Sequence, residues 1–136
     1  MSNSSETQVV FLNNAPSNAI TSATIEHIVG DKQDTYTFSA GQNMPAFGEL
    51  SKPAAFTNVS NTTDEWRFSV TFTDTIHGEH TWTRGPESLL FVESKDGGRM
   101  VIVSISDQGG NWGEHDNGPT ATVAYASTCD NWNLHT

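Results

Sequence analysis

The sequence predicts an all-β protein, built as a single antiparallel β-sandwich or a small closed barrel of eight or nine strands. Residues 66–73 alternate apolar and polar side chains, with Trp66, Phe68 and Phe72 on one side, which is the period of a half-buried strand. Short β-prone segments recur between clusters of Gly, Pro, Asn and Asp. No segment shows the 3.6-residue period of an amphipathic helix.

Several short strands are expected before residue 60. Residues 9–12 form an apolar run, which is typical of a strand buried on both faces. Residues 19–29 present two alternating sets of side chains, and Tyr36 and Phe38 alternate with hydroxyl side chains. The expected strands are residues 8–13, 19–29, 35–39 and 54–59, with an irregular crossing at 40–51 that carries Gly and Pro and tucks Met44 and Phe47 beneath it.

The second half of the chain is expected to hold two hairpins and a last strand. Trp82 lies on the strand that returns after a turn at residues 74–78. Lys95-Asp96-Gly97-Gly98 supplies the glycines that a tight reversal needs, and residues 100–105 are the most apolar run, as in a central strand. The expected strands are residues 64–73, 79–83, 89–93, 99–106 and 120–127, with a turn at 84–87, a long polar loop at 106–119 and a tail after residue 127.

The 136 residues are expected to form one domain, residues 8–136, after a disordered N-terminal tail at residues 1–7. The first residues lack the positive flank and apolar run of a signal peptide, so a cytoplasmic location is expected, with unconventional release left open. Cys129 is the only cysteine, which excludes an intrachain disulfide.

The charge balance narrows the classes of partner. The chain has 16 acidic and 6 basic side chains, for a net charge of −10, and the basic ones are scattered singly. Nucleic acid and anionic membranes would repel such a molecule. The composition favours a glycan or other neutral polar ligand, a neutral lipid surface, a cation or another protein. A homo-oligomer that pairs edge strands is a further option.

The loop at residues 106–119 is the main candidate binding site, because loops of this length are usually functional or disordered. A Trp ring stacks on the apolar face of a sugar while carboxylates and amides bond its hydroxyls. The same oxygen-rich side chains can hold calcium, although their spacing is not that of an EF-hand. The alternative is that Trp112 folds back onto the core. The candidate ligand-binding residues are Asp107, Asn111, Trp112, Glu114, His115, Asp116, Asn117 and Trp132.

Trp132 belongs to this set because the sequence around it repeats the spacing of residues around Trp112. Residues 111–115 and 131–135 share the spacing Asn-Trp-x-x-His. If the tail lies beside the loop, Trp112 and Trp132 form two walls of one cleft. Otherwise Trp132 anchors the C-terminus against the sandwich.

The histidines suggest only a weak metal site. His77 and His80 are three residues apart in a turn and strand, where such neighbours point to opposite faces, whereas zinc hydrolases place theirs four apart on a helix. Surface histidines at a hairpin end are the simpler interpretation. His27 is expected to be a core or partly buried histidine bonded to a backbone group, and a role as a ligand is the alternative. Motifs for a nucleophile elbow, a phosphate loop or HExxH are missing, so no catalytic residue and no cofactor other than calcium is nominated.

Three motifs follow one another across residues 8–105: Val9-Val10-Phe11-Leu12-Asn13-Asn14, Ala23-Thr24-Ile25-Glu26-His27 and Asp64-Glu65-Trp66-Arg67-Phe68-Ser69-Val70, with a loop at Gly41. This organisation resembles the small proteins up-regulated in long-lived insulin-receptor mutants of nematodes. The resemblance implies a β-sandwich with an open biochemical role. In size and acidity the chain is also similar to aegerolysins, sandwiches that recognise membrane lipids, which is an analogy of class without a shared motif.

Three functions follow from these observations. The first is a non-enzymatic recognition protein, lectin-like, that binds glycans in defence or self/non-self interaction. The second is a toxin-like sandwich that recognises a membrane lipid, as aegerolysins do. The third is a metal-dependent enzyme that uses His77, His80 and His115.

Overall fold

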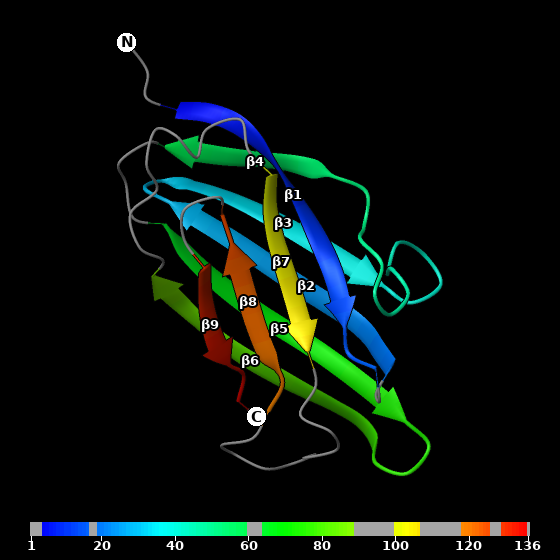
Figure 1. Cartoon of the computed structure of the whole chain (residues 1–136). Coiled ribbons are helices and arrows are strands. Elements are labelled where there is room, and N and C mark those ends of the chain that lie inside the picture. The colour runs from blue at the N-terminus through cyan, green and yellow to red at the C-terminus, as the bar shows by residue number, and fades with distance from the viewer. Residues whose placement is uncertain are drawn as a thin grey trace.

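The computed structural model describes residues 4–16, 19–59, 64–88, 100–106, 118–125 and 129–135. Within these ranges the protein is all-β (Figure 1). No helix is found in them, and therefore none long and apolar enough to span a membrane. The strands are β1 (Ser4–Asn14), β2 (Ala19–Val29), β3 (Lys32–Ser39), β4 (Ala54–Val59), β5 (Glu65–Asp74), β6 (Gly78–Ser88), β7 (Met100–Ser106), β8 (Thr120–Ala124) and β9 (Cys129–Asn133).

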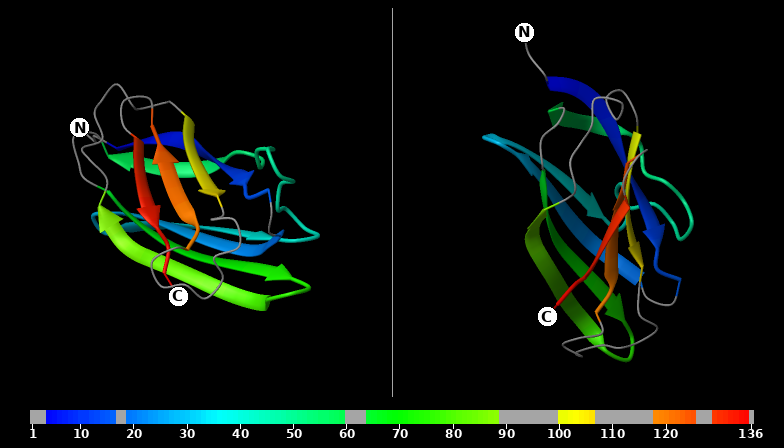
Figure 2. Two further views of the ribbon diagram at one scale, coloured as in Figure 1. Left: turned by 60° about the horizontal axis from the view of Figure 1, so that its bottom comes forward. Right: turned by 60° about the vertical axis from the view of Figure 1, so that its left-hand side comes forward.

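The strands form two sheets that face each other as two layers (Figure 2). A five-stranded sheet has the order β4-β1-β7-β8-β9, and a four-stranded sheet has the order β3-β2-β5-β6. The two sheets do not close into a barrel, so the barrel alternative is wrong.

The expectation of a wholly antiparallel structure is also wrong, because β1 and β7 pair in parallel. Their register runs from Gln8 beside Met100 to Asn14 beside Ser106. Parallel neighbours need a long crossover connection. Here the intervening chain supplies it, since it crosses to the four-stranded sheet as β2 and β3, returns as β4, and crosses again as β5 and β6 before it reaches β7.

The core lies between the two sheets, and the alternating strand is at its centre as predicted. Trp66, Phe68 and Phe72 on β5 are 0% exposed. They meet apolar side chains of the opposite sheet, such as Phe11 and Val103. Burying each such ring or branched side chain contributes about 1.5–3 kcal/mol, so this face of β5 accounts for much of the stability.

The predicted turn at residues 84–87 is wrong, because β6 continues through it to Ser88. The register shifts between Trp66, which pairs with Glu87, and Phe68, which pairs with Arg84. The one extra residue on β6 forms a bulge, which bends the strand without ending it. Gly85 sits in this bulge with φ of 116°, a conformation that glycine takes without strain.

The ends of the chain also differ from expectation. β1 begins at Ser4, before the predicted boundary at residue 8. The predicted tail contains β9, which pairs with β8, and beyond it His135 makes an isolated bridge with Thr83. The predicted strand at residues 89–93 lies outside the described residues.

Candidate functional site

Most of the predicted binding residues cannot be placed. Asp107, Asn111, Trp112, Glu114, His115, Asp116 and Asn117 lie outside the described residues. Trp132 is described, on β9, where it is half-buried and packs against the core with its ring 5.7 Å from that of Phe68. This position matches the interpretation of Trp132 as an anchor for the C-terminus.

The two candidate metal ligands lie at and next to the β5–β6 turn, with His77 in the turn and His80 on β6, and each contacts another side chain. The His77 N–H donates to Asp74 Oδ1 over 2.6 Å, and its ring Nδ1 lies 3.0 Å from Asp74 Oδ2. These bonds hold the pKa of Asp74 below its usual range. The His80 ring lies 4.4 Å from the Trp82 ring. Among the described residues no group of three or more His, Cys, Asp or Glu is placed to hold a metal ion.

A pocket lies instead beside residues 40–53, the crossing segment that connects β3 to β4. Its volume is about 320 Å³. We call it the crossing pocket. Its lining residues are Phe38, Gln42, Asn43, Met44, Pro45, Leu50, Ser51 and Lys52.

Hydrogen bonds to β1 fix one side of the crossing segment. The Asn13 side chain donates to the Pro45 carbonyl over 3.0 Å, and the Gly48 N–H donates to the Asn13 carbonyl over 2.7 Å. The Phe11 N–H donates to Ser51 Oγ over 2.9 Å. The crossing segment therefore pairs with the edge of β1 in the five-stranded sheet, beside the part of β1 that lies beyond the start of β4.

Hydrogen bonds to β3 fix the other side. The Ser39 N–H donates to Asn43 Oδ1 over 2.9 Å, and Asn43 Nδ2 donates to the Thr37 carbonyl over 2.8 Å. Both flanks of the pocket are thus tied to a sheet. This makes it a preformed site, as most small-molecule sites are.

The lining combines an apolar floor with a polar rim. Phe38, Met44 and Pro45 provide the floor, while the exposed rim carries the apolar side chain of Leu50, the amide of Gln42 and the ammonium group of Lys52. Lys52 is the only ionisable residue among the lining residues, so they offer no acid–base pair for catalysis. Such a lining fits binding of a neutral molecule that has an apolar part.

The prediction that Met44 and Phe47 tuck beneath the crossing segment holds for one of them. Met44 is half-buried and packs against the core. Phe47 is 56% exposed. The Glu49 N–H donates to the Ala46 carbonyl over 2.9 Å, which makes a tight turn with Phe47 at its apex, and an apex side chain points away from the body.

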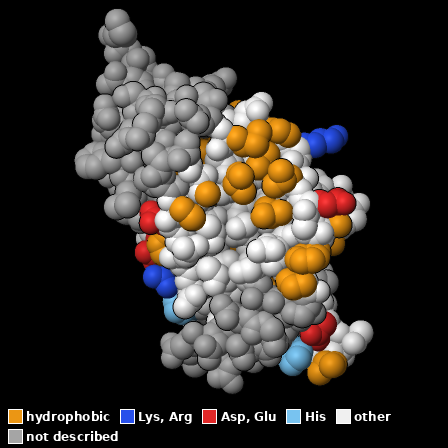
Figure 3. Space-filling model, in the orientation of Figure 1, with side chains coloured by type: hydrophobic (Ala, Val, Ile, Leu, Met, Phe, Trp, Pro, Cys, Tyr) orange, Lys and Arg blue, Asp and Glu red, His pale blue; other side chains and the backbone are white. Residues whose placement is uncertain are grey.

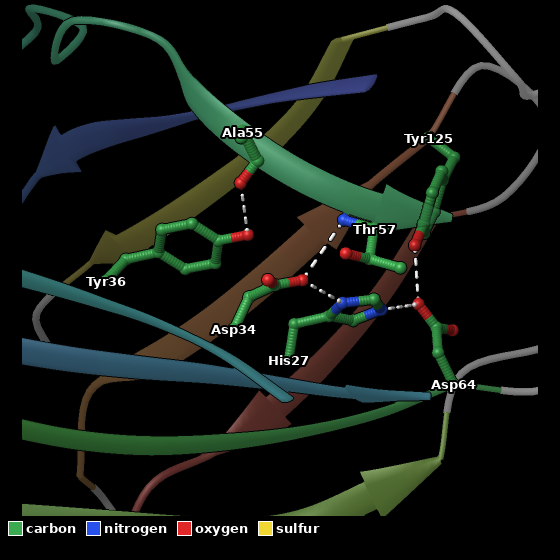
Figure 4. A network of polar contacts seen from close by, with 7 residues as sticks. All are labelled: His27, Asp34, Tyr36, Ala55, Thr57, Asp64 and Tyr125. Atoms are coloured by element: carbon green, nitrogen blue, oxygen red, sulfur yellow. Dashed lines mark hydrogen bonds and ion pairs between the residues drawn. The ribbon is translucent and has the colours of Figure 1, made fainter. Parts of the chain in front are cut away.

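Apart from the crossing pocket, a cluster of polar side chains bridges the two sheets inside the core (Figure 4). Asp64 Oδ2 lies 2.6 Å from His27 Nε2 and accepts a hydrogen bond from the Tyr125 hydroxyl over 2.5 Å. His27 stacks between Phe56 and Trp66, with ring centroids 4.1 and 4.7 Å away. His27 and Asp64 are each 1% exposed, so this cluster holds the sheets together and is closed to ligands.

The expectation that a backbone group satisfies His27 is therefore wrong, because a carboxylate does so. On the other side of the ring, Nδ1 lies 3.6 Å from Asp34 Oδ2, which accepts the Thr57 N–H over 3.1 Å. Nearby, the Tyr36 hydroxyl donates to the Ala55 carbonyl over 2.7 Å. Asp64 is 37 residues from His27 along the chain, and no local sequence signal connects them.

Comparison with known proteins finds no matching family and no matching curated protein. The function is therefore inferred from the geometry of this chain.

Proposed function

We propose that this protein is a β-sandwich that acts in recognition without catalysis and binds a neutral ligand in the crossing pocket, with a glycan as the first candidate. The observation that carries the proposal is the lining of the pocket, which has an apolar floor and, at its rim, an amide and the ammonium group of Lys52. Lys52 is the one ionisable residue of the lining, in a chain of net charge −10. A ligand with dense negative charge would be disfavoured by the field of the whole molecule.

A glycan fits this lining on two grounds. The C–H face of a pyranose packs on apolar side chains, here Met44 and Leu50, and its hydroxyls accept hydrogen bonds from donors such as Gln42 and Lys52. The volume of about 320 Å³ lies at the small end of ligand sites, which suits a terminal sugar. Recognition of one terminal sugar is consistent with a role in defence or self/non-self interaction.

The predicted loop at residues 106–119 begins where β7 ends, at Ser106. Ser106, the last described residue before it, pairs with Asn14, and the neighbouring Asn13 bonds the crossing segment. We propose that Trp112 and the polar residues around it extend the same binding rim.

The test is a glycan array, followed by titration of the hits. Leu50→Arg places a bulky charged side chain at the pocket, where Leu50 is 52% exposed, and is expected to abolish binding. Ile76→Arg, at a side chain that is 85% exposed on the β5–β6 turn, is the matched control and should bind like the wild type. Trp112→Ala tests the loop. The proposal fails if no glycan binds or if Leu50→Arg binds unchanged.

A neutral lipid surface is the second candidate, and one observation favours it. Phe47 and Leu50 expose large apolar side chains on the crossing segment, 56% and 52%, next to Lys52. Side chains of this kind enter the boundary between headgroups and acyl chains. The protein should then co-sediment with vesicles of phosphatidylcholine, sphingomyelin and sterol, and the Phe47→Ser variant should remain in the supernatant. If no neutral vesicle binds, this candidate is excluded.

The metal-dependent enzyme remains a proposal that depends on His115, outside the described residues. Metal analysis of untagged protein tests it, and the absence of a stoichiometric ion excludes it.

A further inference from the structure

The outer face of the five-stranded sheet is apolar at its centre. Because side chains alternate along a strand and pair across the ladder, Val10 and Leu12 of β1 share this face with Met100 and Ile102 of β7 and Ala124 of β8. Met100 is 43% exposed and Ile102 38% exposed. Val10 is 2% exposed and does not belong to the core cluster between the sheets.

The sequences of the two strands at the centre of this face are apolar without interruption, at residues 9–12 of β1 and 100–103 of β7. Strands that are buried on both faces show such continuous apolar runs, whereas a strand with one open face alternates apolar and polar side chains. One face of each strand is covered by the core. The pattern indicates that the other face is covered as well.

The centre of this face carries no charge among the side chains that the structure describes there. None of the described side chains on β1 from Gln8 onward, on β7 or on β8 is charged, and Asp130 of β9 alternates with the outward Asn131. Around the apolar centre lie hydroxyl and amide groups, such as Thr122, which donates to Asn131 over 2.6 Å. Figure 3 shows hydrophobic side chains across this face and the charged side chains at its margins.

We propose that this outer apolar face is a homodimer interface, in which two copies pack their five-stranded sheets face to face about a two-fold axis. Charge selects a second copy as the occupant. A basic partner would be attracted to the acidic side chains elsewhere on the protein, whereas two copies of net charge −10 repel each other least when they meet through this uncharged centre of the sheet. An apolar patch with an uncharged rim is also complementary to itself.

The size of the face sets the strength of the dimer. The face is five strands wide, at about 4.8 Å per strand, and about six residues long, at about 3.3 Å per residue, so its area is roughly 500 Å² per copy. A standard interface buries about 800 Å² per partner, so the dimer should be weak and dependent on concentration. Salt screens the repulsion between the two acidic bodies and should strengthen association, the reverse of a contact held by opposite charges.

The experiment is sedimentation velocity over a concentration series at low and high salt. The weight-average mass of the wild type should rise with concentration toward twice the monomer mass, and further in high salt. Ile102→Glu buries a charge from each copy and should weaken the dimer roughly tenfold or more. Thr81→Glu, at an exposed position of β6 on the other sheet, is the matched control and should dimerise like the wild type. A wild type that stays monomeric, or an Ile102→Glu variant that dimerises unchanged, overturns the proposal.

A second measurement needs no variant. The chain has three methionines, so methyl labelling gives few and separable signals. On dilution the Met100 signal should shift and the Met44 signal should stay. If neither shifts, or if Met100 responds to neutral vesicles while the protein remains monomeric, the face serves another purpose and the dimer is excluded.

Discussion

Tyr125→Phe is the sharpest test of how the two sheets are held together. The substitution keeps the ring, which is 93% buried next to Phe56, because Tyr125 is 7% exposed and the ring centroids lie 5.9 Å apart. It removes only the hydroxyl that donates to Asp64 Oδ2 over 2.5 Å. Any change in stability therefore reports on the contacts of this hydroxyl.

The expected magnitude follows from the charge of the acceptor. A hydrogen bond to a charged group contributes about 1.5–3 kcal/mol, and its loss here leaves a buried carboxylate with one donor fewer. For a chain of 136 residues, each kcal/mol lowers the melting temperature by roughly 3–5 °C. Tyr125→Phe should thus lower the melting temperature by roughly 5–15 °C. Urea unfolding followed by Trp fluorescence measures the free energy directly.

Tyr36→Phe is the matched control. Its hydroxyl also joins the two sheets, but it donates to a neutral acceptor, the Ala55 carbonyl. A neutral hydrogen bond contributes about 0.5–1.5 kcal/mol, so Tyr36→Phe should cost about half as much. If the two variants lose the same free energy of unfolding, or if Tyr125→Phe is neutral, the role assigned to Asp64 is refuted.

Three further predictions concern ionisation and the backbone. Burial and the nearby Asp34 charge raise the pKa of Tyr36, so the folded protein keeps a proton that the unfolded chain loses near pH 10. The contribution of Tyr36 to stability is therefore complete below about pH 10 and is lost as the pH rises above it. Urea unfolding at a series of pH values should show this loss for the wild type and a smaller loss for Tyr36→Phe. The pKa of Asp74 is lowered from 3.8 by its bonds to His77, so its contribution is present above about pH 4 and is lost as the pH falls through the folded value, which carboxyl NMR titration should show. Gly85→Ala places Cβ 2.5 Å from the Trp66 carbonyl oxygen at φ of 116° and should cost about 2–4 kcal/mol, whereas Gly48→Ala, with φ of 81° and nothing within 4 Å, should cost about 1 kcal/mol in thermal unfolding.

The core could be predicted because the period of β5 is local. Trp66, Phe68 and Phe72 fall on one face whatever strand lies beside them, and all three are buried. The parallel pairing of β1 and β7 could not be predicted, since it depends on which sheet the chain visits in between. β9 was missed for a similar reason. Its sequence is polar apart from Cys129 and Trp132, and pairing with β8 supplies the strand conformation.

The candidate site was partly visible in the sequence. Glycine and proline without a period predicted an irregular segment at residues 40–51, and the structure confirms it. The pocket itself depends on the bond that the Asn13 side chain donates to the Pro45 carbonyl, 32 residues away along the chain, and no local sequence signal connects these two residues. Trp112 drew attention because an aromatic ring in a polar loop is a common sugar platform, and that prediction stays open.

The central claim is that the crossing pocket holds a neutral ligand, and the methionine methyl signals test it most directly. Met44 lines the pocket and Met100 lies on the opposite side of the sheet from the core. Titration with a neutral glycan from the array should shift the Met44 signal in a saturable way and leave Met100 unchanged. A Met44 signal that stays fixed at saturating ligand would contradict the assignment of the pocket.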